Sequence, residues 1–557
     1  MTQPRPSVTL PQGKIVGIQL NDDFPQPVDA FLGIPYAQPP VGDLRFRPAV
    51  KVAPSTETLD ASEYGPIAPG KALLQTGPKL EQSEDCLTAN VFRPSTSYYN
   101  GNGKPLPVAI YIHGGAFNRG SASMHNTAPM VAWSAEPFVA VSFGYRLGAL
   151  GFLPSNVTKR EGALNLGLRD QVLLMEWVQE NIARFGGDPD AVTLIGLSAG
   201  AHSIGHHLLN YSPNRAPLFR RVVIESGAPT SRAVRPYNAA IHEAQFTDFL
   251  SEVGAPANLP ESEIFPFLRS LPTETITRAQ TAVFDKYNPS LRWAFQPVID
   301  GEDQKEGGII PRAPLHAWKN GLWHKLPILT GFTTNEGTMY VEKALDNAAG
   351  FRAFWANLLP ALSDSDLDTI EKLYPDPAIH ADSPYIETRT GHGLGAQYKR
   401  IEAAYAHYAY VAPVRQTAEF ATKQNPGSVW LYHWALPRTV VGRANHADNM
   451  YYESFNKDIT GISPVQEELS GVLHAYITSF IVSGDPNAVK GRYAKRPEWG
   501  VYEVERPKVL VFGEGIEELV GGENVGEVAK FVDDTWARGS TGETEFWWSK
   551  VEVSQVA

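Results

Sequence analysis

One serine of the chain stands in a setting that is typical of a nucleophile. Ser198 is the centre of Gly196-Leu197-Ser198-Ala199-Gly200, and an apolar run over 191–195 precedes it. A strand followed by Gly-x-Ser-x-Gly and a helix forms a sharp turn that holds the serine side chain clear of the backbone, and glycines tolerate the crowding on either side. Because the pentapeptide also occurs as an ordinary turn, the prediction of a nucleophile requires a base, an orienting acid and an oxyanion hole elsewhere in the chain.

A second segment supplies a candidate oxyanion hole. The strand-like run Leu106–Ile112 is followed by His113-Gly114-Gly115-Ala116-Phe117. A glycine-rich turn at the end of a strand directs successive backbone N–H groups toward one point, as a developing oxyanion requires. Alone this segment reads equally well as a plain loop, but together with the serine turn it favours acyl-transfer chemistry.

The composition excludes several classes of protein. The net charge of -12 over 557 residues disfavours binding to nucleic acid or anionic membranes, and no apolar run approaches the length of a membrane span. A single cysteine, Cys86, rules out an internal disulfide and a metal–thiolate site. Neither a metal nor a cofactor is expected. The sequence does not specify an oligomeric state.

The N-terminal segment and the cysteine content also bear on location. Residues 1–13 are interrupted by three prolines and have no apolar core of the kind found in secretory signals. We therefore expect a cytoplasmic protein, with secretion by a route that needs no such signal as the alternative.

Strands and helices alternate around these segments. Buried strands are predicted at Leu106–Ile112, 137–145, 191–195 and Arg221–Glu225, with a helix over 167–183 between the second and third. This alternation predicts an α/β protein with a mostly parallel sheet covered on both faces, and ligands bind at the carboxyl edge of such sheets. We expect a single domain over 1–557 with helical cap insertions at roughly 230–290 and 340–425, and a helix over 470–483 against the far end of the sheet.

These motifs together resemble the type-B carboxylesterase/lipase family of α/β-hydrolases, which includes cholinesterases and fungal lipases. The resemblance extends over nearly the whole chain and includes 31–37, 44–48, 84–91, 165–171 and 185–189. It implies the α/β-hydrolase fold. It also implies that Gly115, Ala116 and Ala199 donate their N–H groups to the oxyanion, and that Glu336, in Asn335-Glu336-Gly337, is the acid of the triad.

Three histidines lie in the region where the family carries its base. His433 falls in the strand-like run Val429–Trp434 and His474 falls in the helix over 470–483, so both read better as packing residues. His446 lies in a polar loop, Asn445-His446-Ala447-Asp448, where the resemblance places the catalytic histidine. The match is partial, because members usually carry an acidic residue three positions later and this chain has Asn449. We predict a catalytic triad of Ser198, Glu336 and His446.

Three departures from the family narrow the expected substrate. Leu197 replaces the glutamate that many relatives carry before the serine, which favours an apolar site and leaves Ser226 without its usual polar partner. The family closes a loop with a disulfide at Cys86, but this chain has Ala68 at the position of the partner cysteine. The segment between them has no aromatic residue to bind a quaternary ammonium group and no amphipathic helix pattern, which disfavours a choline ester and a lipase lid.

The resulting prediction is a serine carboxylic-ester hydrolase that acts on a small to medium apolar ester through an acyl-enzyme. The pocket is expected to include Gly114, Phe117 and Leu197, with Trp293, Phe295 and Phe351 as further wall candidates. An acyl transferase or lactonase with the same triad is the alternative, and a non-catalytic binding homologue is a weaker one.

Overall fold

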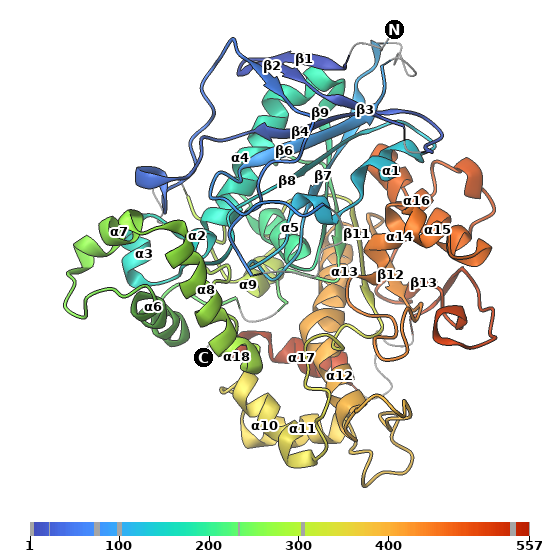
Figure 1. The fold of residues 1–557 in the computed structure, drawn as a ribbon. Coiled ribbons are helices and arrows are strands. Elements are labelled where there is room, and N and C mark those ends of the chain that lie inside the picture. The colour runs from blue at the N-terminus through green and yellow to red at the C-terminus, as the bar shows by residue number, and fades with distance from the viewer. Residues whose placement is uncertain are drawn as a thin grey trace.

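The computed structural model describes residues 5–21, 23–71, 78–96, 103–231, 234–301, 307–534 and 542–555. Within these ranges the chain forms one sheet of eleven strands and a small sheet of three (Figure 1). The small sheet consists of β1 (Ser7–Leu10), β2 (Gly13–Val16) and β5 (Thr58–Asp60).

The large sheet is parallel through its centre. Its strands lie in the spatial order β14 (Ala529–Asp533), β13 (Lys508–Phe512), β12 (Val429–Trp434), β11 (Ile328–Thr333), β10 (Arg221–Glu225), β9 (Gly187–Leu197), β7 (Leu106–Ile112), β8 (Val139–Phe143), β6 (Thr88–Pro94), β4 (Val28–Pro35) and β3 (Ile18–Leu20). The run from β13 to β8 is parallel, whereas the strands at both ends pair antiparallel. The carboxyl ends of the central strands therefore meet at one edge.

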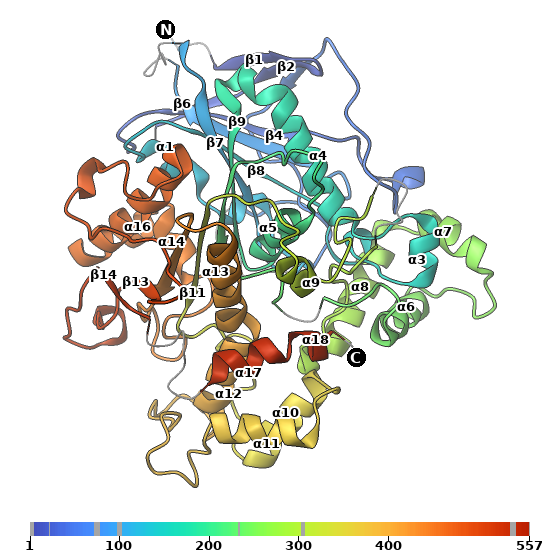
Figure 2. The ribbon, with the colours of Figure 1, turned by 180° about the vertical axis from the view of Figure 1, so that it is seen from behind.

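Helices cover both faces of this sheet, as the continuous apolar runs of the central strands require (Figures 1 and 2). One face carries α4 (Leu166–Asn181), α5 (Ala199–Leu209), α9 (Pro314–Lys319) and α13 (Ala412–Gln424). The other carries α1 (Thr127–Ala132), α14 (Asp448–Glu453), α15 (Lys457–Thr460) and α16 (Pro464–Ser483). Neighbouring residues of β9 show the alternation: Leu194 belongs to the first core and Ile195 to the second. The predicted α/β class with a mostly parallel, doubly covered sheet is confirmed.

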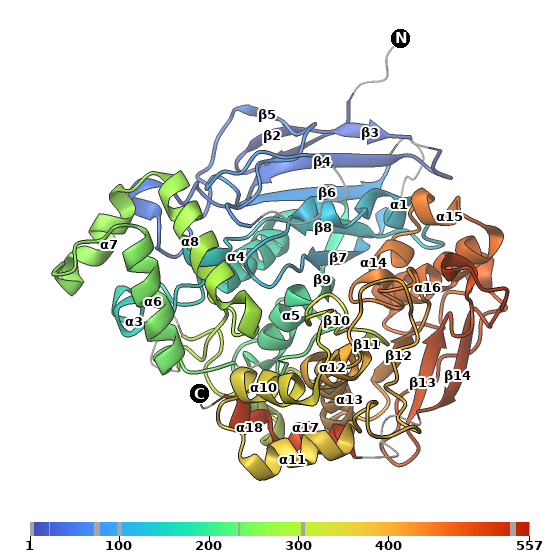
Figure 3. The ribbon, with the colours of Figure 1, turned by 60° about the horizontal axis from the view of Figure 1, so that its bottom comes forward.

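Two further groups of helices lie beside this core (Figure 3). The first consists of α6 (Ala240–Glu252), α7 (Glu261–Ser270) and α8 (Thr273–Tyr287). The second consists of α10 (Ala348–Leu358), α11 (Asp364–Leu373) and α12 (Tyr398–Ala406), and it packs with α17 (Glu543–Ser549) around Trp355 and Trp547. Short helices α2 (Gly148–Gly151), α3 (Asn156–Glu161) and α18 (Val551–Ser554) complete the set in the described residues. Helix α13 lies within the range 340–425 but packs on β11 and β12.

The helix predicted over 470–483 differs in length and position. It is the second half of α16, which begins at Pro464 because the Ser463 side chain accepts a hydrogen bond from the Gln466 N–H at 3.2 Å. Its apolar side packs against α14 and β7, in the middle of the sheet and not at its far end.

Candidate active site

Ser198 occupies the sharp turn between β9 and α5. Its backbone dihedral angles are φ 58 and ψ -122, a conformation that side-chain-bearing residues rarely adopt. The Ser198 N–H donates to the Glu225 carbonyl at 2.9 Å, and the Ser198 carbonyl accepts from the His202 N–H at 2.9 Å. The turn is therefore fixed from the neighbouring strand β10 and from the first turn of α5.

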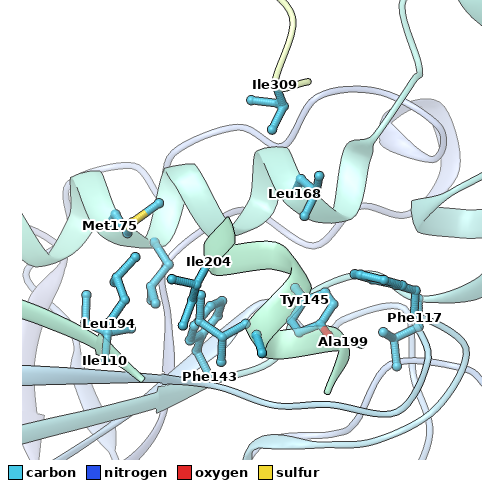
Figure 4. Packing of buried hydrophobic residues seen from close by; sticks show 14 of the residues in the cluster. Ile110, Phe117, Phe143, Tyr145, Leu168, Met175, Leu194, Ala199, Ile204 and Ile309 are labelled. Atoms are coloured by element: carbon cyan, nitrogen blue, oxygen red, sulfur yellow. The ribbon is translucent and has the colours of Figure 1, made fainter. Parts of the chain in front are cut away.

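The glycines of the pentapeptide are required by close packing of backbones. A Cβ atom on Gly200 would lie 1.9 Å from the Ile112 carbonyl oxygen, and one on Gly196 would lie 2.8 Å from the Gly200 carbonyl carbon. Figure 4 shows α5 starting at Ala199, with Ile204 among the packed apolar side chains near Phe143 and Leu194. This close approach of helix and strand holds the serine at the carboxyl edge of the sheet.

The glycine-rich turn after β7 lies directly against the serine. A Cβ on Gly114 would lie 2.7 Å from the Leu197 carbonyl oxygen and 3.0 Å from the Cβ of Ser198. Gly115 has φ 114, and a Cβ there would lie 2.0 Å from the Arg119 carbonyl oxygen. Within the described residues, no protein acceptor takes the N–H groups of Gly115, Ala116 or Ala199. Three donors are therefore available near the serine.

Two residues of this turn, Ala116 and Phe117, adopt left-handed conformations with φ 55 and φ 62. Such conformations cost free energy for residues other than glycine and persist only where neighbours impose them. The Ala116 carbonyl accepts from Asn118 Nδ2 at 2.9 Å and from Gln296 Nε2 at 3.0 Å, and the Phe117 carbonyl accepts from the Gly148 N–H at 2.8 Å. The Gly115 carbonyl accepts from the N–H groups of Asn118 at 3.1 Å and Arg119 at 3.2 Å, and the Ala116 N–H of the same planar peptide unit therefore points the opposite way.

The side chains of His446 and Glu336, two of the residues of the predicted triad, lie in contact. A hydrogen bond joins His446 Nδ1 to Glu336 Oε2, and the other carboxylate oxygen accepts from the Thr333 N–H at 2.8 Å. Both side chains are buried. His446 Nε2 is buried and has no hydrogen-bond partner in the described part of the chain. The bond at Nδ1 thus orients the imidazole ring, and Nε2 is available to accept a proton.

The two remaining histidine candidates have other partners. His433 Nε2 lies 2.7 Å from Thr334 Oγ1, and burial lowers the pKa of His433 to about 3. His474 Nε2 lies 3.0 Å from the Met130 carbonyl oxygen, and burial lowers its pKa to about 4. Neither histidine approaches the Glu336 carboxylate by a hydrogen bond.

The predicted pocket residues have different surroundings. Phe117 lines a small cavity together with Trp293. Leu197 is buried in the core of the opposite sheet face with Val223 and Leu329 and does not line that cavity, because its position on β9 points it away. Phe295 and Phe351 are also core residues: the first belongs to the main core and the second to the cluster around α10.

A buried pair of carboxyl groups, those of Glu225 and Glu453, was not predicted. Glu225, whose carbonyl holds the Ser198 N–H, has its carboxyl group bonded at 2.9 Å by both the Tyr432 hydroxyl and Asn449 Nδ2. Burial and the neighbouring Glu453 raise the pKa of Glu225 well above its ordinary value, and burial raises that of Glu453 to about 7. Asn449, the departure noted after His446, is thus a donor to Glu225. Ser226 Oγ has no partner among the described residues.

The loop that follows Ala68 is held by backbone hydrogen bonds in place of the disulfide of the family. Cys86 is buried and free, but hydrogen bonds join the two sides of the loop: Ile67 N–H donates to the Glu81 carbonyl at 2.9 Å and Ser83 N–H to the Ile67 carbonyl at 3.0 Å. Residues 72–77 of this loop, on which the expected absence of a lid partly rests, lie outside the described residues.

Fold and site together define the class of protein as a serine hydrolase of the α/β-hydrolase type. A family model described as "Carboxylesterase family" matches residues 4–523. The chain belongs to the carboxylesterase family and is a serine carboxylic-ester hydrolase.

Individual relatives agree with this assignment. The chain is 35% identical over 514 residues to "Secreted lipase 4" of Gibberella zeae, covering 90% of this chain and 88% of the relative. It is 33% identical to "Lipase 4" of Diutina rugosa, covering 77% of this chain and 80% of the relative. Among solved structures, Aspergillus niger EstA has a TM-score of 0.79 at 28% identity, with all of both chains covered. These likenesses confirm the predicted α/β-hydrolase fold.

The expectation of a cytoplasmic location is wrong. Two Gibberella zeae relatives are named as secreted, "Secreted lipase 4" and a secreted triacylglycerol lipase, and they point to an extracellular location. A single cysteine does not report the compartment, because a chain of this size buries a sufficient core without disulfides. In the described ranges, no helix has both the length and the apolar character needed to cross a membrane, and no cluster of three or more potential metal ligands is found.

Proposed function

We propose that the protein hydrolyses small to medium-sized soluble esters through an acyl-enzyme on Ser198, with His446 as base and Glu336 as its orienting acid. The observation that carries this proposal is the Glu336–His446 hydrogen bond, together with the lack of a hydrogen-bond partner for His446 Nε2 among the described residues. An imidazole held on Nδ1 by a carboxylate has its basic nitrogen at Nε2.

The reaction follows from these positions. Nε2 takes the Ser198 proton as Oγ attacks the ester carbonyl, and the oxyanion accepts hydrogen bonds from the N–H groups of Gly115, Ala116 and Ala199. The protonated imidazole then gives its proton to the departing alcohol. A water molecule, deprotonated in the same way, releases the acid and restores the serine.

Aromatic side chains form an apolar wall near this centre. The Trp293 ring lies 5.7 Å from the Tyr340 ring, and the Tyr340 ring lies 5.5 Å from His446. Trp293 also clusters with Ala116 and Phe284. This wall supports an ester whose acyl group is apolar next to the scissile carbonyl.

Rapid mixing with 4-nitrophenyl butyrate tests the acyl-enzyme. We expect a burst of nitrophenol equal to the concentration of active sites, followed by slower turnover, and a covalent label on Ser198 after treatment with a fluorophosphonate. A burst that survives in Ser198→Ala, or a label on another residue, would contradict the assignment. A screen of ester chain length, with soluble and emulsified substrates, tests the preference for soluble esters.

A further inference from the structure

Glu225 is the last residue of β10, and its backbone lies between two strands that lead to residues of the triad. On one side it is the register partner of Leu197, the residue before Ser198. On the other side it pairs with Gly331 of β11, the strand that leads to Glu336. The Glu225 carbonyl accepts from the Ser198 N–H at 2.9 Å. The main chain of this one residue therefore fixes the serine turn beside the strand of the acid.

The side chain of the same residue contacts the third segment of the triad. Asn449 Nδ2 donates to Glu225 Oε1 at 2.9 Å, and Asn449 follows His446 by three residues. Asn449 lies in the first turn of α14, which begins two residues after the histidine. Both side chains are fully buried, and a hydrogen bond shielded from water is electrostatically strong. The segment of the histidine is thus tied to the residue that holds the serine turn.

The neighbours of the Glu225 carboxyl group fix which of its oxygens accepts. The Tyr432 hydroxyl donates to Oε1 at 2.9 Å, so Oε1 takes both donors. Burial and the neighbouring Glu453 raise the pKa of Glu225 well above its ordinary value, and the proton of the neutral carboxyl group is carried by Oε2. Oε1 is therefore an acceptor with or without the charge. A glutamine at this position would offer the same acceptor.

The distance between Ser198 and His446 decides how well the reaction runs. In both of its steps a proton passes through His446 Nε2, and proton transfer requires hydrogen-bond reach. The Glu336 carboxylate orients the imidazole ring, but it belongs to the loop after β11 and not to the serine turn. The bond between Glu225 and Asn449 joins positions that are 224 residues apart and connects the serine turn with the histidine segment.

We propose that Glu225 is a positioning residue of the triad, which sets the distance between Ser198 and His446 through its carbonyl and its carboxyl group. The inference rests on the proposed function of Ser198. A purely structural role of Glu225 gives equal weight to its two donors. The positioning role gives the greater weight to Asn449, because Tyr432 lies on β12 and not on the segment of the histidine.

Removal of each donor in turn tests the proposal by steady-state hydrolysis of 4-nitrophenyl butyrate. kcat is referred to the folded fraction, measured by circular dichroism. We expect Asn449→Leu to lower kcat by about 10- to 100-fold, with KM within about twofold of the unmodified protein. Tyr432→Phe is the matched control, because it removes a donor to the same oxygen at the same distance, and kcat should fall by no more than about threefold. Equal losses of kcat in the two variants would overturn the proposal.

Two variants of Glu225 test the acceptor itself. Glu225→Gln keeps an oxygen for both donors, so kcat should stay within about threefold of the unmodified protein. Glu225→Leu removes the acceptor, and kcat should fall as it does in Asn449→Leu. The double variant with Asn449→Leu should lose no more than the larger single loss, because both residues act through one bond.

Three outcomes would contradict the positioning role: a retained kcat in Glu225→Leu, an equal loss in Glu225→Gln, or a double loss equal to the product of the single losses. If Glu225→Leu does not fold, the Asn449 and Tyr432 variants still decide. Hydrolysis by the unmodified protein that is lost in Ser198→Ala keeps these outcomes separate from the proposed function. Absence of that hydrolysis in the unmodified protein would contradict the proposed function itself.

Discussion

Asn335 and Ala444 join the loop of the acid to the loop of the histidine. The Asn335 N–H donates to the Ala444 carbonyl at 2.9 Å, and the Ala444 N–H donates to Asn335 Oδ1 at 3.3 Å. Asn335 Nδ2 is held in turn by both carboxylate oxygens of the buried Glu402, each at 3.2 Å. Glu336 directly follows Asn335, and His446 lies two residues after Ala444. The pairing of Asn335 with Ala444 therefore sets the distance between the acid and the histidine.

Asn335→Ala should therefore impair turnover more than binding. Loss of the side chain removes one of the two hydrogen bonds between Asn335 and Ala444 and one donor to Glu402, so the imidazole is held less firmly in its orientation. Small misplacements of catalytic groups cost on the order of 100-fold. We expect kcat for 4-nitrophenyl butyrate to fall by about 10- to 100-fold with little change in KM. A lower melting temperature with an unchanged kcat would show that Asn335 has a purely structural role.

Asn118→Ala tests how the oxyanion turn is held. Asn118 Nδ2 bonds the Ala116 carbonyl at 2.9 Å and the Ala294 carbonyl at 3.1 Å, which supports the left-handed conformation of Ala116. Without it the Ala116 N–H is less firmly directed at the oxyanion, and loss of one such donor costs roughly 100- to 1,000-fold. Because Gln296 still bonds the same carbonyl, we expect a smaller loss of kcat, about tenfold. In the double variant with Gln296→Ala, we expect a loss that exceeds the product of the two single losses. A loss equal to that product would contradict a shared role.

Gly200→Ala should destabilise the fold. The added Cβ would lie 1.9 Å from the Ile112 carbonyl oxygen, a backbone atom of the central strand β7. Helix α5 would have to move away from the sheet, at a cost of about 3 kcal/mol in the free energy of unfolding. Gly254→Ala is the control, because Gly254 has φ +74 and open space around it. An alanine there costs only the backbone strain of a left-handed conformation, about 1 kcal/mol. Denaturant titration of both variants compares the two costs; equal costs would contradict the packing argument.

The buried carboxyl pair predicts a pH-dependent stability. In the unfolded chain Glu453 titrates near pH 4.3, whereas burial raises its pKa in the folded protein to about 7. The folded state thus holds the proton more tightly. The stability that this provides is fully present below about pH 4 and is lost as the pH rises to about 7.

Glu453→Gln, which keeps the shape and removes the titration, isolates this effect. Relative to the unmodified protein, the variant should gain on the order of 2 kcal/mol between pH 4.5 and pH 8. Apart from His125, whose Nε2 lies 3.4 Å from Glu453 Oε1, the buried histidines titrate in both proteins, so their contribution cancels in the difference. A difference in unfolding free energy that stays constant between those pH values would contradict a raised pKa at Glu453.

Local constraints made part of this molecule predictable from sequence. The turn at Ser198 could be found because its glycines lie against specific backbone atoms of β7 and α5. The requirement for glycine therefore falls within five adjacent residues of the sequence. The central strands were equally recognisable, because burial on both faces demands continuous apolar runs. His446 needed the family resemblance, since its bond to Glu336 joins loops separated by 110 positions.

Features assembled from distant segments were not predictable in the same way. The apolar character read from Leu197 concerns the core, because the strand turns that side chain to the other face of the sheet. The small cavity beside Phe117 is lined from α5, α6 and the stretches around Arg235 and Arg292, and no short pattern unites them. Glu225 and Glu453 lie on β10 and α14, and only the fold brings the two carboxyl groups together.

The most direct test of the central claim is the value of kcat/KM for 4-nitrophenyl butyrate in Ser198→Ala. Removal of the nucleophile of such a triad costs about a million-fold, because the remaining groups cannot form the acyl-enzyme. We predict a loss of that order in a variant whose thermal unfolding matches the unmodified protein. Hydrolysis retained within about tenfold would contradict the account.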